Sequence, residues 1–123
     1  MAASIAAELG DDHGEGRVTN NLGIAAYHAR NYAAAAQAWG RSAAAKERTG
    51  DLRGRRISES NRGLALRELG RLPEAIEAAR QALKEALHIG DRRGEATGRL
   101  ALAQLHLDVG DPRGAQVHLE AAQ

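Results

Sequence analysis

The stretch GDLRGRRISESNRGLALRELGRLPEAIEAARQALKEALHIGD, residues 50–91, contains one complete structural unit of the chain. Its first half, from Asp51 to Leu69, consists mainly of good helix formers. Gly70 follows at the position where a glycine commonly ends a helix. The first half of the unit therefore predicts a helix that stops before Gly70.

The second half of the stretch predicts another helix. Pro73 suits the first helical turn, and the helix dipole favours Glu74 beside it. Apolar residues then recur at helical spacing, at Ile76, Ala79, Leu83, Leu87 and Ile89. Gly90 ends this helix, and Asp91 can cap the next one through its side-chain oxygen. One unit is thus a pair of antiparallel helices joined by short turns.

The unit recurs with a period of 40 residues. The aligned positions are the Gly-Asp pairs at 10–11, 50–51 and 90–91, the glycines Gly14, Gly54 and Gly94, and the alanines Ala35, Ala75 and Ala115. Such a period indicates a solenoid, a propeller or a linear array. No stretch alternates with strand period, and both prolines lie at turns. We therefore expect an all-α solenoid of antiparallel helix pairs, one array over residues 1–123.

Three units divide the chain at its Gly-Asp pairs. Repeat 1 spans 11–49, repeat 2 spans 51–89, and repeat 3 spans 91–123. Residues 1–9 align with the end of a preceding second helix, and the chain closes where the last second helix should still be running. Both ends look like cuts in a longer array; the alternative is that the terminal helices act as caps.

Composition excludes several classes of function. The chain of 123 residues carries a net charge of +1 and has no cysteine, which rules out disulfides and thiolate chemistry. No apolar run reaches the roughly 20 residues that a membrane span needs. The balanced charge gives no reason to expect nucleic acid as a partner. We expect a cytoplasmic protein without membrane association.

The repeats resemble tetratricopeptide repeats (TPR). The resemblance is carried in repeat 1 by Asn21, Leu22, Gly23, Tyr32, Ala35, Trp39 and Ser42, in repeat 2 by Gly63, Leu66, Gly70, Leu72, Ala75 and Ala82, and in repeat 3 by Leu102, Ala103, Gly110, Ala115, Leu119 and Ala122. The usual unit has about 34 residues. The 40-residue unit, with a Gly-Asp pair at each boundary, is similar to a subgroup found in polarity adaptors and bacterial signalling regulators. This resemblance implies a right-handed superhelix whose first helices line the concave side.

One turn departs from the pattern. Arg30 stands where repeats 2 and 3 have Gly70 and Gly110, and Asn31, which tolerates left-handed geometry, follows it. We expect Asn31 to rescue this turn.

Spacing assigns two faces to the first helix of repeat 1. One face, Leu22, Ala25, Ala26 and Ala29, is expected to pack against the second helix. Gly23 and Gly63 should let the helices approach closely. Trp39 should fill the largest gap in repeat 1, at a gain of roughly 3–5 kcal/mol over alanine.

The opposite face of the first helices is the candidate binding surface. Its residues are Arg17, Asn20, Asn21, Ile24, Tyr27 and His28 in repeat 1, Asn61, Leu64, Arg67 and Glu68 in repeat 2, and Gln104 and Leu107 in repeat 3. Together with Leu100 they mix amides, aliphatics and charges, as peptide recognition requires. An asparagine both donates to and accepts from a peptide unit, so Asn21 and Asn61 are candidate backbone clamps. Asparagines of similar repeats do that job.

The alternative is a solvated helix face in which Asn21 and Asn61 bond to neighbouring repeats. The arginines Arg53, Arg55, Arg56 and Arg62 lack the basic surplus and stacking aromatics of a nucleic-acid site. We expect them to form a solvated, partly ion-paired face.

No catalytic or metal-binding constellation is recognisable. No two of the five histidines have the four-residue spacing of a zinc site. The serines lack a nucleophile-elbow context. We therefore predict a protein that is not an enzyme and needs no cofactor or metal.

The sequence supports two functions. The first is a protein–protein interaction scaffold that binds a peptide segment in the concave groove. The second is a self-association or regulatory segment of a larger bacterial signalling or transcriptional regulator, with homo-oligomers forming through exposed terminal helices. The parentage in the second rests on resemblance alone.

Overall fold

The structure is a computed structural model that describes residues 11–122, and every regular element in that range is an α-helix. The helices are α2 (Asp12–His28), α3 (Tyr32–Arg48), α4 (Leu52–Glu68), α5 (Leu72–Ile89), α6 (Arg92–Asp108) and α7 (Pro112–Ala122). The segment 1–9, predicted to end a preceding helix, lies outside the described residues.

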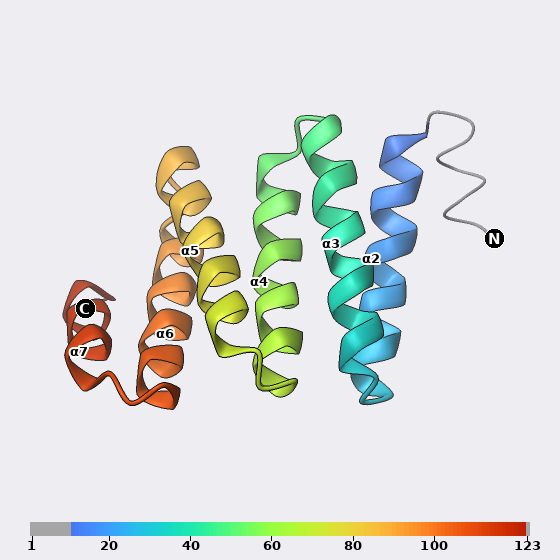
Figure 1. The fold of residues 1–123 in the computed structure, drawn as a ribbon. Coiled ribbons are helices and arrows are strands. Elements are labelled where there is room, and N and C mark those ends of the chain that lie inside the picture. The colour runs from blue at the N-terminus through green and yellow to red at the C-terminus, as the bar shows by residue number, and fades with distance from the viewer. Residues whose placement is uncertain (1–10, 123) are drawn as a thin grey trace.

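Each helix packs against the helices before and after it in the chain. Figure 1 shows the six described helices standing side by side in chain order, with short connections at alternating ends. The pairs α2/α3, α4/α5 and α6/α7 correspond to the three repeats. The predicted all-α array of antiparallel helix pairs is therefore confirmed.

The turns between helices share one left-handed residue. Gly50, Gly70, Gly90 and Gly110 have φ between 71° and 78°, and Arg30 takes the same conformation with φ of 61°. Arg30 itself, and not Asn31, adopts the left-handed geometry at this turn. A side chain costs roughly 1 kcal/mol or more in this geometry. The turn still closes, because the Asn31 N–H donates to the Ala26 carbonyl at 2.8 Å.

Most helices begin with a side-chain cap. The carboxylates of Asp11, Asp51, Asp91 and Asp111 accept the N–H of the glycine three residues later at 2.7–3.0 Å. Asn31 caps α3 in the same way. A Cβ on Gly54 would lie 2.4 Å from a carboxylate oxygen of Asp51. The recurrent Asp-x-x-Gly spacing is therefore a helix start in which the capping carboxylate occupies the space beside the glycine.

Helix α2 contacts α3 through its smallest residues. Gly16, Thr19 and Gly23 are buried on that side, and a Cβ on Gly23 would lie 2.6 Å from Nε1 of Trp39. Leu22, which was expected to pack there, lies only at the margin of the contact, with 51% of its surface exposed. Ala25 and Ala29 are exposed as well, and Ala26 is only half-buried. Leu22 and Ala26 lie at the edge of the contact, where they line a surface hollow with Ala34 and Ala38 of α3.

The buried core runs through the array. It consists of Ala35, Ala36, Trp39, Ala65, Leu66, Ala75, Ala78, Ala79, Leu83, Leu102 and Leu105. The aligned alanines Ala35, Ala75 and Ala115 are at most 1% exposed, as the repeat predicted. Trp39, the largest of these side chains, is 3% exposed, which confirms its predicted burial in repeat 1.

Buried polar contacts join neighbouring helices. The Ser42 hydroxyl donates to the Gly16 carbonyl and lies 3.0 Å from the hydroxyl of Ser58, which connects α2, α3 and α4. The Glu15 carboxylate of α2 accepts from Arg48 at 2.9 Å and from Arg41 at 3.3 Å, both on α3.

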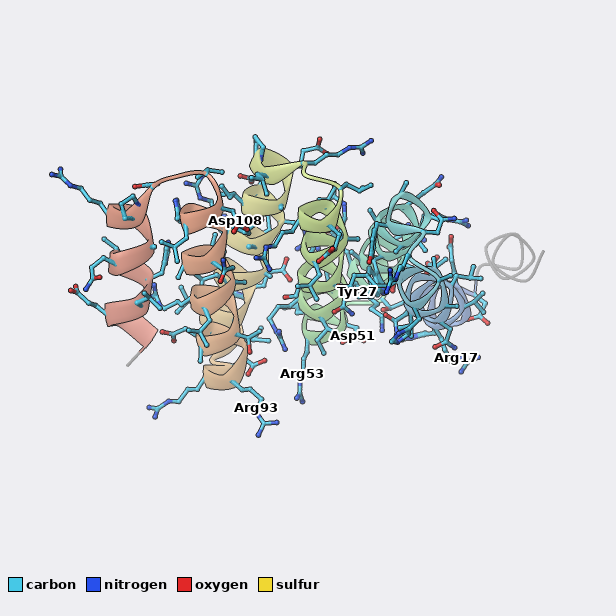
Figure 2. The ribbon with its side chains drawn as sticks, turned by 90° about the horizontal axis from the view of Figure 1, so that it is seen from below. Arg17, Tyr27, Asp51, Arg53, Arg93 and Asp108 are labelled. Atoms are coloured by element: carbon cyan, nitrogen blue, oxygen red, sulfur yellow. The ribbon has the colours of Figure 1, made fainter. Side chains whose placement is uncertain are left out.

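The arginines near the start of α4 differ in their surroundings. Arg53, like Arg93 in the next repeat, extends from the surface (Figure 2). Arg55 pairs with Glu85, as a partly ion-paired face predicts. Arg56, expected to be solvated, is buried, and its Nη2 lies 2.9 Å from Oδ2 of Asp91, the cap of α6. The Gly94 N–H, and then Arg56, hold the pKa of Asp91 below its ordinary value.

The two aligned glycines Gly23 and Gly63 should respond differently to alanine. Gly23→Ala forces the buried Trp39 indole to move and should destabilise the protein by roughly 1–3 kcal/mol. A Cβ on Gly63 meets Ala78 Cβ at an ordinary 3.6 Å. Gly63→Ala should therefore gain up to about 1 kcal/mol from helix propensity. Urea unfolding of both variants measures the difference; equal effects would contradict it.

Candidate functional site

The first helices carry exposed aliphatic side chains on the predicted binding face. Ile24, Leu64, Leu100 and Leu107 have 41–54% of their surface exposed. Their exposure agrees with the sequence pattern. Because α2, α4 and α6 each contribute to this set, exposed apolar surface is present in every repeat.

The candidate site residues fall into two groups by burial. Arg17, Asn21, Ile24, His28, Leu64, Glu68, Gln104 and Leu107 are exposed, and Asn20, Tyr27, Asn61 and Arg67 are half-buried. None of them is buried in the core, so all remain open to a ligand on at least one side.

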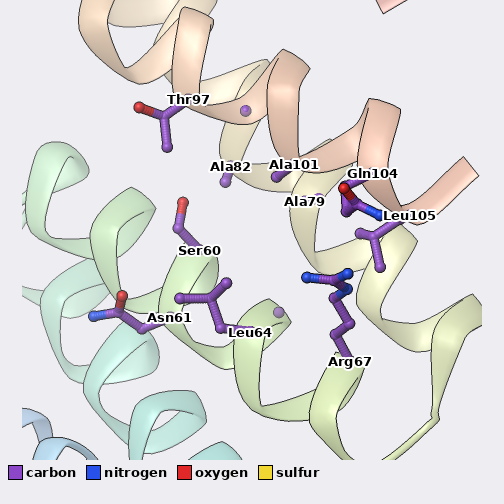
Figure 3. Close-up of a pocket in the computed structure, with 12 residues that line it drawn as sticks. Ser60, Asn61, Leu64, Arg67, Ala79, Ala82, Thr97, Ala101, Gln104 and Leu105 are labelled. Carbon is purple, nitrogen blue, oxygen red and sulfur yellow. The ribbon is translucent and has the colours of Figure 1, made fainter. Parts of the chain in front are cut away.

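Helices α4 and α6 enclose a pocket whose floor is α5, which we call the inter-repeat pocket. It has a volume of about 160 Å³ and is lined by Ser60, Asn61, Gly63, Leu64, Arg67, Ala79, Ala82, Thr97, Gly98, Ala101, Gln104 and Leu105. Its surface is mainly apolar. Figure 3 shows Ser60 and Leu64 on one wall, Thr97 and Gln104 on the other, and Ala79 and Ala82 between them.

The pocket brings together four of the predicted site residues: Asn61, Leu64, Arg67 and Gln104. The six predicted residues of α2, together with Glu68 and Leu107, do not line it. Asn21 and Asn61, predicted as paired clamps, therefore occupy different surroundings. Asn61 borders the pocket, whereas Asn21 is exposed on α2.

An ion pair borders the pocket at Arg67. Arg67 Nε donates to Oδ2 of Asp108 at 2.6 Å, and Gln104 Nε2 donates to Oδ1 at 3.1 Å. The pKa of Asp108 is lowered, chiefly by the hydrogen bond from Arg67 and next by that from Gln104. Since Arg67 is on α4 and both partners are on α6, this contact links repeats 2 and 3 across the candidate surface.

Tyr27 has a packing role in repeat 1. Its ring centroid lies 5.7 Å from that of Trp39 and 5.2 Å from that of Tyr32. Burial, and after it the charge of Glu68, raises the pKa of Tyr27. The ring therefore supports the Trp39 contact, and only the remaining part of its surface is available to a ligand.

Asn20 offers a free acceptor on α2. Its Oδ1 is buried and has no hydrogen-bond partner among the residues that the structure describes. A buried amide oxygen without a partner loses a hydrogen bond that water or a ligand would supply. Asn20 is the repeat equivalent of Ser60 in the inter-repeat pocket.

Several pocket residues were missing from the sequence prediction. Ala79, Ala82 and Gly98 have no functional group, so a search for chemistry-bearing side chains passes over them. The 40-residue register holds the signal that could have found them. Their equivalents one repeat earlier are Trp39, Ser42 and Ser58, all larger.

Within residues 11–122, no group of three or more His, Asp or Glu side chains is arranged to hold a metal ion. His106 and His118 stack with centroids 5.5 Å apart, and His106 Nδ1 lies 3.1 Å from Asp111. The stacked rings join α6 to α7, and the His106–Asp111 contact joins α6 to the residue that caps α7.

No helix in the described part of the chain has the length and apolar character needed to cross a membrane.

Comparison with known proteins adds no relationship: no protein-family model matches the chain, and no curated protein matches it significantly.

The Arg67–Asp108 contact predicts a pH dependence. Because the pKa of Asp108 is lower in the folded chain, its stabilisation is present above the ordinary pKa of 3.8 and is lost as the pH falls through the folded value. Asp108→Asn should lower stability at pH 7 by less than about 1 kcal/mol, since the pair is exposed.

Thermal unfolding of Asp108→Asn and the unmodified protein between pH 7 and pH 3 measures this effect. The two midpoints should converge as the pH falls. A difference that stays constant over this range would contradict the prediction.

Proposed function

We propose that this chain is a tetratricopeptide-like interaction module that binds a peptide segment along the surface of α2, α4 and α6. One observation carries the proposal: an apolar pocket opens between two first helices, with Asn61, Arg67 and Gln104 among its lining residues. The right-handed superhelix implied by the resemblance is part of this proposal.

The chemistry of the surface suits a peptide. Exposed Leu64 and the alanines of the pocket offer apolar contacts, while the amides of Asn61 and Gln104 can donate to and accept from a peptide backbone. A concave, mainly apolar site with few polar groups is typical of ligand pockets. We infer binding without catalysis, because the residues that line the pocket include no His, Asp, Glu or Lys to act as a general base.

The module is proposed to act in the cytoplasm, without a cofactor. A chain without cysteine fits a reducing compartment. The nearly balanced charge favours a protein or peptide partner over nucleic acid.

Selection of peptides from a random display library on the full chain tests this function. Selected peptides should bind with dissociation constants near 1 μM, about −8 kcal/mol. Leu64→Asp places a charge at the apolar surface and should weaken binding about tenfold or more.

Leu87→Asp is the matched control. Leu87 is 50% exposed, close to the 46% of Leu64, but lies on the second helix α5 and outside the inter-repeat pocket. Affinity should stay within about twofold of the original value. Equal loss in both variants, or selection of no peptide at all, would contradict the proposed function.

The second candidate is self-association through α7, and exposed apolar residues favour it. Val117 is 62% exposed and Leu119 is 38% exposed. Leu119 is the repeat equivalent of the buried Trp39 and Ala79, a position that packs inside the other repeats. A second copy of the chain could cover this surface.

Light scattering across a range of concentrations tests self-association. If α7 mediates it, the mean mass should rise with concentration, and Val117→Lys should restore the monomer. A monomer at every concentration would exclude this candidate.

A further inference from the structure

Three of the residues that line the inter-repeat pocket are smaller than their equivalents one repeat earlier. Trp39 becomes Ala79, Ser42 becomes Ala82, and Ser58 becomes Gly98 one repeat later. All three smaller residues line the inter-repeat pocket. The pocket therefore occupies the position at which the preceding interface, between α2, α3 and α4, holds an indole ring and a pair of hydroxyl groups.

In repeat 1 these side chains fill the space between helices. The Trp39 ring covers Gly23, where an added Cβ would lie 2.6–2.7 Å from three indole atoms. Ser42 and Ser58 close the neighbouring space with a buried contact of 3.0 Å. The arrangement shows that this fold accommodates a large aromatic ring at this position of the repeat.

In repeat 2 the glycine that accommodates the ring remains, but the ring is missing. Gly63, the equivalent of Gly23, lines the pocket, and its nearest neighbour is the small Ala78. The resulting space of about 160 Å³ is open to the surface. A cavity of roughly 150 Å³ engineered into another protein binds benzene, so the volume suits an aromatic ring.

The walls of the pocket suit a planar group. Its floor consists of Ala79 and Ala82, and its walls include Gly63, Gly98 and Ala101, so part of the lining presents flat backbone and Cβ surfaces. Arg67, the equivalent of Tyr27 beside Trp39, brings a guanidinium group to the same pocket. A guanidinium stacks favourably on an aromatic face and gains little from an aliphatic chain.

The chain itself has no free aromatic side chain for the pocket. It contains one Trp, two Tyr and no Phe. All three aromatics lie in repeat 1, with Tyr27 against both Tyr32 and Trp39 at centroid distances of 5.2 and 5.7 Å. An aromatic occupant would therefore come from another molecule.

We propose that the inter-repeat pocket binds one aromatic side chain of a partner peptide, at the position equivalent to that of Trp39 in repeat 1. This inference rests on the proposed peptide-binding function and identifies its anchor. Asn61 on α4 and Gln104 on α6 belong to opposite walls of the pocket. In this proposal their amides contact the peptide backbone on either side of the ring.

The test uses N-acetyl-L-tryptophanamide as the probe and N-acetyl-L-alaninamide as its control, each titrated into the ¹⁵N-labelled full chain. The tryptophan derivative should shift the amide resonances of Ala79, Gly98 and Ala101 with a dissociation constant of the order of 1 mM. The alanine derivative should leave them unchanged.

Two variants fill the pocket from different walls. Ala79→Trp restores the residue of repeat 1 and should abolish the shifts while the chain stays folded. Ala101→Leu makes a smaller change at a half-buried position and should weaken the affinity for the probe about tenfold. This variant tests the pocket even if Ala79→Trp prevents folding.

Two results would overturn the inference: no localised shift in the unmodified chain, or a probe affinity unchanged in both variants. Failure of the proposed function gives a different result. In that case the display library yields no peptide, although the probe still binds the pocket. A third result would contradict the aromatic anchor alone: the library selects peptides that lack an aromatic residue and bind Ala79→Trp as tightly as the unmodified chain. The proposed peptide-binding function would then stand.

Discussion

Each helix between residues 12 and 122 depends on the helices next to it in sequence to bury its apolar face. Contacts between α2 and α3, α3 and α4, and onward to α7 hold the array together. A single helix pair has too little apolar surface to fold alone, so stability accumulates from one interface to the next. Small residues control these interfaces, since Gly23 allows the Trp39 indole to lie against the α2 backbone. The spacing between helices, and with it every surface feature, follows from this packing.

Polar contacts hold consecutive repeats in register. Ser42 and Ser58 meet between repeats 1 and 2, and Arg56 reaches the capping carboxylate of Asp91 between repeats 2 and 3. A buried arginine requires a charged or hydrogen-bonding partner, so the Arg56–Asp91 contact restricts how α4 and α6 sit. The pocket between these helices is therefore bounded by a fixed contact near their N-terminal ends and by the Arg67–Asp108 pair near their C-terminal ends.

The repeat architecture separates the fold from the binding chemistry. The alanine column at Ala35, Ala75 and Ala115 maintains the helix contacts in all three repeats. At other aligned positions the side-chain volume differs between repeats. The change from Trp39 to Ala79 opens a space without altering the order of the helices. A proposed binding site thus arises from a local loss of volume within an otherwise repeated core, and the surrounding interfaces keep the cavity from collapsing.

The sequence alone determined the helices, their pairing and their limits. Gly-Asp punctuation provides a left-handed turn residue and a capping carboxylate, which are local effects that need no tertiary contact. The sequence also indicated which face of the first helices is exposed, including Leu64 and Gln104. It missed the exposure of Ala25 and Ala29 and the burial of Arg56, because burial depends on how closely a neighbouring helix approaches and on a partner in the next repeat. Only the tertiary structure decided that Ala79, Ala82 and Gly98 border one cavity, since the free volume belongs to three helices at once.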